Sequence, residues 1–346
     1  MTVDVSVLVP VLNEEAHLPR ALHTMLAQRV DGAAEFLLID GGSTDRSREI
    51  IEEHAERDPR VRLLHNPARR TPQALNIGLR AAGGTFVARM DAHAEYPPDY
   101  LQLGIDRLRR GDVVSVSGPQ LAVGEGRWSR RVALALRSAL GVGGARFRRL
   151  EDREFEVDSG FTGVWRRDVL VAAGGWDEDW PNDQDLELAA RLRKDGGRYV
   201  CLPAMAASYI PRDSLVALAR QYWRYGFYRV KTSNRHPESL RPSQLLPPLL
   251  TLSFVGAAVP TRIASGPARL GLLIYALALL HSTIEAAREE EPRDAAALPL
   301  VYVAMHVSYG VGFMEGCARW GLPVRAVSEQ LKACASRALP DCERPT

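Results

Sequence analysis

The order of apolar patterns in the first hundred residues is the feature that most limits the fold. Short runs rich in Val, Ile and Leu predict buried strands at residues 3–10, 35–40, 61–65 and 85–91. The segments between them space their apolar residues as helices do, at residues 14–28, 45–56 and 72–82. Alternating strands and helices predict an α/β fold, with a mostly parallel sheet and helices on both faces.

Polar clusters follow three of the predicted strands, at residues 10–14, 40–45 and 91–95. Ligands of open α/β sheets bind outside the carboxyl ends of the strands. We therefore expect these clusters to form one site rather than three.

Composition narrows the class of protein further. The chain has 346 residues, 46% of them hydrophobic and 25% charged, which suits a folded protein with a large core. A net charge of +2 argues against a nucleic-acid binder, which needs a strongly basic face. The four cysteines form no Cys-x-x-Cys pair, so neither a zinc site nor a disulfide framework is indicated. The N-terminus lacks a signal-peptide pattern, and we expect a cytoplasmic catalytic domain.

The first two clusters are Pro10-Val11-Leu12-Asn13-Glu14 and Asp40-Gly41-Gly42-Ser43-Thr44-Asp45. An ordinary strand-to-helix turn would also explain the first. In the second, two glycines let the backbone approach a ligand closely, and Asp40 could accept hydrogen bonds from a base or ribose. Helix capping by Ser43, Thr44 or Asp45 is compatible with that role.

Two later clusters carry candidate chemistry. Asp91 and His93 lie two apart on an extended segment, so both side chains can face one cation, and this ligand pair suits Mn²⁺ or Mg²⁺. Residues 180–187 place three acidic groups at a predicted helix start, where the helix dipole favours them. One of these carboxylates could instead act as a general base.

In this order, the four clusters resemble the motifs of inverting family 2 glycosyltransferases with the GT-A fold. The resemblance covers residues 3–236. Residues 76–101 are especially similar to bacterial exopolysaccharide glucosyltransferases of the succinoglycan type. The segment Arg220-Gln221-Tyr222-Trp223-Arg224-Tyr225-Gly226 is similar to the Gln-x-x-Arg-Trp motif of polysaccharide synthases, with Tyr225 in the Trp position.

The resemblance implies metal-dependent transfer from a nucleotide-diphosphate sugar, with UDP-hexose expected, to a hydroxyl of a lipid-linked saccharide. Asp185 would be the catalytic base, and Asp91 and His93 would hold Mn²⁺ or Mg²⁺. The donor-binding residues would be Pro10, Val11, Asn13, Glu14, Asp40, Gly42, Ser43, Asn76 and Asp91. The acceptor and diphosphate side would be Gly160, Thr162, Gly163, Gln221, Arg224 and Tyr225.

The sequence departs from the family pattern at two positions. His93 replaces the usual second Asp, which keeps metal binding but softens the metal preference. Gln184 replaces the usual Glu before the base, which removes a charged neighbour. When the sequence is aligned with the family pattern by counting back from residues 191–196, Asp185 takes the position of the base, and Asp183 lies one residue outside the pattern.

Other functions stay open at this point. A soluble transferase acting on a small metabolite would share all of these motifs. A non-catalytic scaffold that binds nucleotide sugars would keep the fold without the activity. A dinucleotide-dependent oxidoreductase is disfavoured, because no Gly-x-Gly-x-x-Gly follows the first strand.

Beyond the expected catalytic domain at residues 1–236, residues 237–346 form an apolar, helical extension. Uncharged stretches occupy residues 245–259, 270–284 and 295–314. A bilayer span needs about 20 apolar residues, and three spans would place the basic tail outside, against the positive-inside tendency. Two interpretations remain: helices packed on the catalytic domain or on a second copy as a homodimer, or helices associated with the inner face of the cell membrane, some of them re-entrant.

Overall fold

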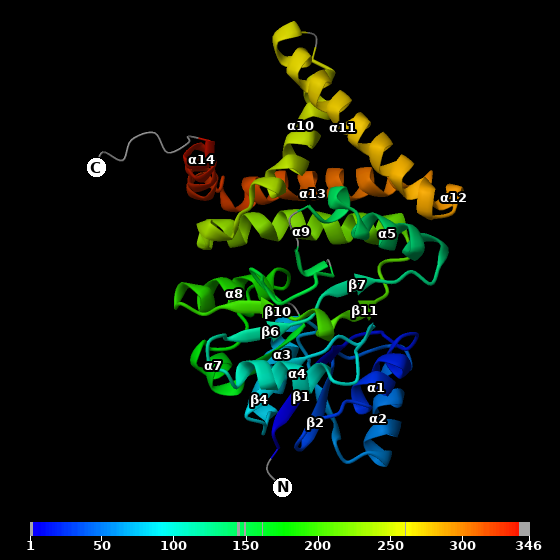
Figure 1. Ribbon diagram of the computed structural model, residues 1–346, viewed down its shortest axis with the longest axis vertical. Coiled ribbons are helices and arrows are strands. Elements are labelled where there is room, and N and C mark those ends of the chain that lie inside the picture. The colour runs from blue at the N-terminus through cyan, green and yellow to red at the C-terminus, as the bar shows by residue number, and fades with distance from the viewer. Residues whose placement is uncertain (1–2, 144–145, 149, 161, 260, 339–346) are drawn as a thin grey trace, which may run out of the picture. The chain divides into compact units, whose positions relative to one another are not determined.

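The computed structural model describes residues 3–143, 146–148, 150–160, 162–259 and 261–338. The chain forms two compact units, Met1–Val123 with Ala145–Pro211, and Gly124–Gly144 with Arg212–Thr346 (Figure 1). The first unit is α/β and the second is helical. The predicted domain boundary at residue 236 stays a prediction; the compact units divide near residue 211.

An eight-stranded sheet organises the first unit, in the order β3-β2-β1-β4-β9-β6-β10-β8. Six strands run in one direction, while β9 is antiparallel to β4 and β6, and β8 is antiparallel to β10. The expected mostly parallel sheet is therefore confirmed. The strands are β1 (Val5–Val11), β2 (Ala34–Asp40), β3 (Val61–His65), β4 (Phe86–Arg89), β6 (Ser115–Ser117), β8 (Phe155–Glu156), β9 (Gly163–Arg166) and β10 (Tyr199–Cys201).

Helices cover both faces of this sheet because its strands are apolar on both sides. In β1, Val7 and Val9 pack with α1, α2 and α4, while Leu8 packs on the opposite face with α3, α7 and α8. The helices of the first unit are α1 (Leu18–Leu26), α2 (Ser47–Arg57), α3 (Thr71–Ala81), α4 (Tyr100–Leu108), α7 (Arg167–Ala172) and α8 (Gln184–Lys194).

A second sheet of three strands lies beside the polar segment after β4. It has the order β5-β11-β7, with β5 (Ala94–Glu95), β11 (Ala207–Tyr209) and β7 (Gln120–Ala122). Because β5 begins one residue after His93, its pairing with β11 limits where the segment after β4 can lie.

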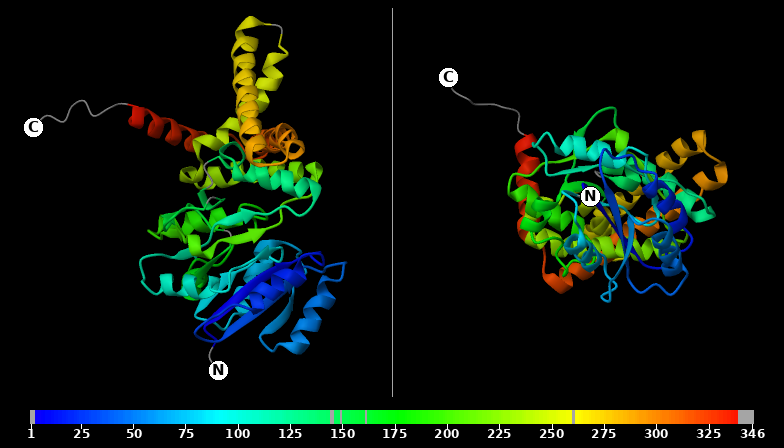
Figure 2. Two further views of the ribbon diagram at one scale, coloured as in Figure 1. Left: turned by 45° about the vertical axis from the view of Figure 1, so that its right-hand side comes forward. Right: turned by 90° about the horizontal axis from the view of Figure 1, so that it is seen from below.

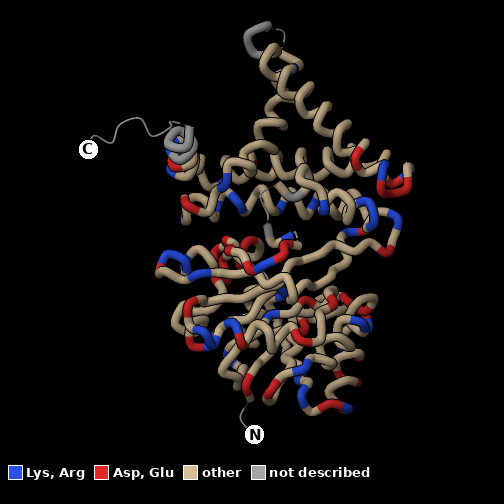
Figure 3. Tube along the Cα trace, viewed as in Figure 1, with Lys and Arg blue, Asp and Glu red and all other residues tan. Residues whose placement is uncertain are grey.

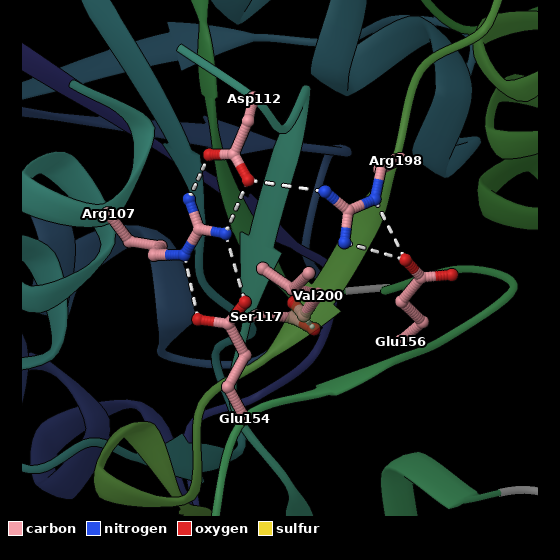
Figure 4. Close-up of polar contacts among 7 residues, drawn as sticks. All are labelled: Arg107, Asp112, Ser117, Glu154, Glu156, Arg198 and Val200. Atoms are coloured by element: carbon pink, nitrogen blue, oxygen red, sulfur yellow. Dashed lines mark hydrogen bonds and ion pairs between the residues drawn. The ribbon is translucent and has the colours of Figure 1, made fainter. Parts of the chain in front are cut away.

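Ion pairs of the buried Arg107 and of the exposed Arg198 connect the edge strand β8 to the rest of the first unit (Figure 4). The buried Arg107 of α4 donates to both carboxylate oxygens of Glu154 at 2.7 and 2.9 Å, and also to Asp112. Arg198 donates to Glu156 at 2.8 Å and to Asp112 at 3.2 Å. The network joins the end of α4 to the segment that enters β8.

The second unit is built on two long helices, α9 (Leu215–Arg235) and α13 (Leu298–Trp320), packed side by side (Figure 1). Glycines allow the two backbones to touch: a Cβ on Gly226 would lie 2.0 Å from the Tyr309 carbonyl oxygen. A Cβ on Gly312 would lie 2.0 Å from the carbonyl oxygen of Trp223.

The remaining helices of this unit are α5 (Arg127–Arg137), α6 (Ala139–Val142), α10 (Leu246–Ala257), α11 (Arg262–Glu289), α12 (Pro292–Ala295) and α14 (Val324–Ala338). Short 3₁₀ helices occur along the chain at Arg146–Arg148, Pro203–Met205, Pro237–Ser239 and Pro242–Leu245. The helices α10 and α11 pack against each other as a hairpin that rises from the α9–α13 layer (Figure 2).

Candidate functional site

The segments that follow β1 and β2 are joined to each other by hydrogen bonds. The two strands are parallel and place Val11 opposite Asp40, so both chains leave the sheet at the same edge. The backbone N–H of Asn13 donates to Ser43 Oγ at 3.0 Å, and Asn13 Oδ1 accepts from the Thr44 N–H at 2.8 Å. The two clusters that the sequence singled out therefore form one continuous surface.

Asp40 shapes the turn after β2. It is 1% exposed, and its carboxylate accepts from the backbone N–H groups of Gly42 at 3.1 Å and Ser43 at 3.0 Å. Gly42 has φ +73°, a conformation that favours glycine. Asp40 thus holds the turn in shape, and its predicted contact with a nucleoside stays a prediction.

The residues of the first cluster take different positions. Pro10 and Val11 lie within β1, where Val11 is buried and accepts from the Gly41 N–H at 2.8 Å through its carbonyl oxygen. Asn13 has φ +56°, an uncommon left-handed backbone of the kind found at functional sites. The N–H of Glu14 donates to Ser47 Oγ at 2.7 Å.

The segment after β4 approaches the first cluster. His93 Nδ1 lies 3.4 Å from Glu14 Oε1, so the end of β4 and the end of β1 meet at these two side chains. The N–H of Asp91 donates to the Tyr96 hydroxyl at 2.7 Å, which fixes the start of the segment. The three polar clusters after β1, β2 and β4 therefore come together as the sequence predicted.

The described residues contain no group of three or more His, Cys, Asp or Glu side chains arranged to hold a metal ion. Mg²⁺ in phosphate-binding enzymes is commonly held by one or two protein carboxylates together with substrate phosphates. The donor atoms of Asp91 and His93, with Glu14 beside His93, suit such a site. The segment is a turn, in which the Ala94 N–H donates to the Asp91 carbonyl oxygen at 3.2 Å, and not the extended segment expected, so a cation shared by Asp91 and His93 stays a prediction.

A buried arginine, Arg89, joins Asp91 to Asp185. Its Nε donates to Asp91 Oδ1 at 3.0 Å, and its Nη1 donates to Asp185 Oδ1 at 2.6 Å. The side chain of Arg89 is 8% exposed, and those of Asp91 and Asp185 are 12% and 15% exposed. Burial lowers the pKa of Arg89, but the two carboxylates outweigh it and leave this pKa above its ordinary value.

Arg89 is not among the site residues predicted from the sequence. The available signal was a charged residue in the otherwise apolar strand Phe86-Val87-Ala88-Arg89, because a buried guanidinium needs carboxylate partners. Two residues later the chain provides one such partner, Asp91.

Asp185 stands in the first turn of α8. Burial raises its pKa to about 6, although the Arg89 guanidinium acts in the opposite direction. The amide of Gln184 donates to Asp185 Oδ2 at 3.2 Å, so the residue that replaces the family's Glu contacts the carboxylate directly. Asp183 is the N-cap residue of α8, without a side-chain capping hydrogen bond, and its φ of +60° makes it a second left-handed residue at this site.

Two buried contacts hold the start of α8. Asn76 of α3 donates to the Trp176 carbonyl oxygen at 2.8 Å and accepts from the Trp176 N–H at 2.9 Å. The fully buried Glu187 accepts from Arg191 at 2.8 Å, and Arg191 also donates to the Gly175 carbonyl oxygen at 2.8 Å. Asn76 therefore supports the segment that leads into α8, while its predicted role in donor binding stays a prediction.

The residues predicted for the acceptor side fall in two places. In the first unit, Thr162 is buried and its hydroxyl accepts from the Gln120 amide at 2.5 Å. A Cβ on Gly160 would lie 2.7 Å from Ser117 Oγ, and a Cβ on Gly163 would lie 3.0 Å from a carbonyl oxygen of β6. Packing within the protein thus already requires small residues there, and Phe161 lies outside the described residues.

The other acceptor-side candidates lie on α9 in the second unit. Gln221 donates to the Tyr225 hydroxyl at 2.9 Å, one helical turn further along. Arg224 is exposed. The roles of these residues at the diphosphate or the acceptor stay predictions.

Comparison with known proteins gives consistent results. A family model described as glycosyl transferase family 2 matches residues 6–171. The succinoglycan biosynthesis protein ExoA of Rhizobium meliloti is 29% identical over 309 residues, which cover 89% of this chain and 93% of that protein. This similarity confirms the resemblance to succinoglycan-type enzymes.

A second relative is a dolichyl N-acetyl-alpha-D-glucosaminyl phosphate 3-beta-D-2,3-diacetamido-2,3-dideoxy-beta-D-glucuronosyltransferase of Methanococcus voltae. It is 24% identical over 90% of this chain and 96% of its own length. Among solved structures, a mannosyltransferase from Pyrobaculum calidifontis in complex with GDP-Man and Mn²⁺ matches with a TM-score of 0.52 and 20% identity. The match covers 94% of this chain and 86% of that chain. The fold expected from the sequence, GT-A, is confirmed.

Proposed function

We propose that this chain, whose residues 6–171 match glycosyl transferase family 2, transfers a sugar from a nucleotide-diphosphate sugar to a hydroxyl of a lipid-linked saccharide. The relatives support a place in polysaccharide or lipid-linked glycan biosynthesis. The observation that carries the proposal is the Arg89 bridge, which holds Asp91 and Asp185 on one guanidinium. A carboxylate suited to a metal–diphosphate and a carboxylate suited to a base thus share one site.

Asp185 acts as the general base in this proposal. It accepts the proton of the acceptor hydroxyl while that oxygen attacks the anomeric carbon. The bond from the anomeric carbon to the diphosphate breaks at the same time, and the nucleoside diphosphate leaves with the bonding electrons. A single displacement from the opposite face inverts the configuration of the sugar. A pKa of about 6 leaves Asp185 mostly ionised at neutral pH and still basic enough to take the proton.

Asp91 and His93 would hold a divalent cation, Mn²⁺ or Mg²⁺, which supplies positive charge to the diphosphate leaving group. The mannosyltransferase with the similar fold was solved with Mn²⁺ and a nucleotide sugar, which supports this cofactor class. Uridine is the base we propose, from the family resemblance, with the nucleoside held by the segments after β1 and β2. The first unit would work on the cytoplasmic side of the cell membrane.

Incubation of the purified protein with a panel of nucleotide sugars, Mn²⁺ and a short-chain lipid-linked acceptor tests the proposal. Transfer of one sugar is expected, and NMR of the product should show the anomeric configuration opposite to that of the donor. A product that retains the donor configuration would overturn the single-displacement mechanism. Binding without turnover across the panel would favour a nucleotide-sugar scaffold.

A further inference from the structure

Within the described residues, two helical segments are long and apolar enough to cross a membrane, Ser265–Glu289 and Pro292–Trp320. Length and composition alone would make them two spans joined by a short charged link on the far side. Contacts within the second unit are incompatible with that arrangement.

The charged link is bound to α5. Arg131 of α5 donates to Asp294 of α12 at 2.8 Å, and the two side chains are only 9% and 15% exposed. The chain passes from β7 to α5 through residues 123–126. Four residues reach at most about 14 Å, whereas the hydrocarbon core of a bilayer is about 30 Å thick. Chain connectivity therefore keeps α5 on the same side of a membrane as β7, and the ion pair keeps α12 there too.

The helix α13 is bound along its length to the segment after α5, to α6 and to α9. The Tyr302 hydroxyl donates to Ser138 Oγ at 2.8 Å, and His306 Nε2 lies 3.2 Å from the Leu140 carbonyl oxygen. Near its other end, Glu315 accepts from the indole N–H of Trp223 at 3.1 Å. A helix that packs closely on the arginine-rich α9 cannot also be surrounded by lipid, so its apolar composition reflects packing.

The α10–α11 hairpin has the opposite character. In the most apolar stretch of α11, within Ser265–Glu289, only 6% of the residues are buried. By sequence, residues 242–284 contain no Asp, Glu or Lys and two arginines, Arg262 at the start of α11 and Arg269 two turns later. Charged residues instead gather below the hairpin, on α9, α5 and α12 (Figure 3). The large apolar side chains that the hairpin exposes are Leu246, Leu249, Leu252, Phe254, Val255, Leu270, Leu273, Ile274, Leu277, Leu280 and Ile284.

We propose that the α10–α11 hairpin enters a lipid bilayer and returns to the side it came from, while α12 and α13 remain outside the hydrocarbon core. The length of α10 and the length of the uncharged part of α11 fit this topology. The 12 residues of α10 rise about 18 Å, and the stretch between Arg269 and Glu285 rises about 22 Å, both short of a full crossing. Charged residues flank the hairpin at its base, Arg241 before α10 and Glu285 in the last turns of α11, where lipid headgroups would lie. This inference goes beyond the proposed function, because it concerns none of the residues of the candidate site.

Flotation of the purified full-length protein with vesicles of phosphatidylethanolamine and phosphatidylglycerol tests whether the hairpin binds a lipid bilayer. We expect the protein to float with the vesicles. Leu273→Asp combined with Leu277→Asp should weaken binding at least about tenfold, because each buried carboxylate is costly in hydrocarbon. The matched control Leu331→Asp, at an equally exposed position on α14, should float normally. Equal flotation of the double variant, or a vesicle-free dimer that buries the hairpin, would overturn the proposal.

Labelling of single cysteines tests the topology. In a chain without its native cysteines, Glu291→Cys reports on the link before α12, and Glu56→Cys on the exposed face of α2 marks the side of the first unit. A membrane-impermeant maleimide should label both positions from the same side of the membrane. Labelling of Glu291→Cys from the opposite side would show that α11 and α13 both span. Neither result depends on transfer activity, so this inference and the proposed function can fail separately.

Discussion

Arg89 sets the electrostatics of the candidate site at the scale of single residues. Its two hydrogen bonds hold Asp91 and Asp185 in fixed positions before any ligand arrives. Two buried carboxylates without this cation would repel each other, and one of them would take up a proton. The guanidinium therefore opposes the effect of burial on the pKa of Asp185 and favours its ionised form.

The first prediction concerns Asp185. An acceptor hydroxyl is a poor nucleophile, so removal of the general base should lower turnover by about 10²- to 10⁴-fold. We expect Asp185→Asn to show this loss in steady-state kinetics and to bind the nucleotide sugar with near-normal affinity. Asp183→Asn is the matched control, because Asp183 is the N-cap residue of the same helix and lies one residue outside the family pattern, and it should lose far less. The reverse order of the two variants would mean that the register of this motif is wrong.

A second prediction follows from the raised pKa of Asp185. Below a pH of about 6 the carboxylate is protonated and cannot act as a base, so kcat/KM should fall as pH decreases through this value. The free energy of unfolding depends on pH in the opposite direction from the activity. Because the pKa of Asp185 is higher in the folded state than in the unfolded state, protonation of this carboxyl stabilises the folded state. That stabilisation is present below the ordinary pKa of 3.8 and is lost as pH rises through about 6.

Substitution of Arg89 separates the effect of its charge on the pKa of Asp185 from the effect of burial on the same pKa. Arg89→Met removes the charge that lowers the pKa of Asp185, so the acidic limb of the pH–rate profile should move to higher pH. Arg89→Lys keeps the charge and should move the limb less. An unchanged limb in Arg89→Met would show that the activity-controlling group is not Asp185.

At the scale of elements, glycine contacts decide how α9 and α13 pack. A Cβ at Gly226 or at Gly312 would fall 2.0 Å from a carbonyl oxygen of the facing helix, so the helices must separate to accept it. We predict that Gly226→Ala and Gly312→Ala each destabilise the second unit by about 1–3 kcal/mol, the usual cost of overpacking. Gly266→Ala in α11, where nothing lies within 4 Å of the added atom, should not lower the melting temperature. Equal effects at all three glycines would contradict this account of the packing.

Local pattern was enough to predict the first four strands and the helices between them. The third strand begins and ends where it was expected, at Val61 and His65, because turn residues and polar residues flank its apolar core. The uncharged stretch at residues 270–284 lies within a longer helix, Arg262–Glu289, because Pro267 and the charged ends do not stop it. Sequence patterns do not reveal the antiparallel insertion of β9 between β4 and β6, because pairing across more than 70 residues leaves no local signal.

The candidate site was predictable only in part, for a related reason. Motif order predicts roles for Asp91, His93 and Asp185, because each follows a strand or begins a helix at one edge of the sheet. The partners of these residues come from elsewhere in the chain: Arg89 reaches Asp185 across 96 positions, and Asn76 supports the start of α8 from α3. Such contacts depend on tertiary packing, which no single-sequence pattern encodes.

At the scale of the whole molecule, the division into two compact units makes the thermal response to ligands informative. The segments after β1, β2 and β4 and the start of α8 all belong to the first unit. A nucleotide sugar bound there with its cation stabilises that unit by mass action, by about 2.7 kcal/mol at one hundred times the dissociation constant.

We therefore predict that UDP-sugar with Mn²⁺ raises the melting temperature in calorimetry, and that neither component alone does so to the same extent. Excess EDTA should remove the shift, and Asp91→Asn should abolish it together with transfer activity, whereas Glu56→Gln on α2 should leave both intact. A full shift and full activity in EDTA would contradict the assignment of Asp91 and His93 to a metal–diphosphate site.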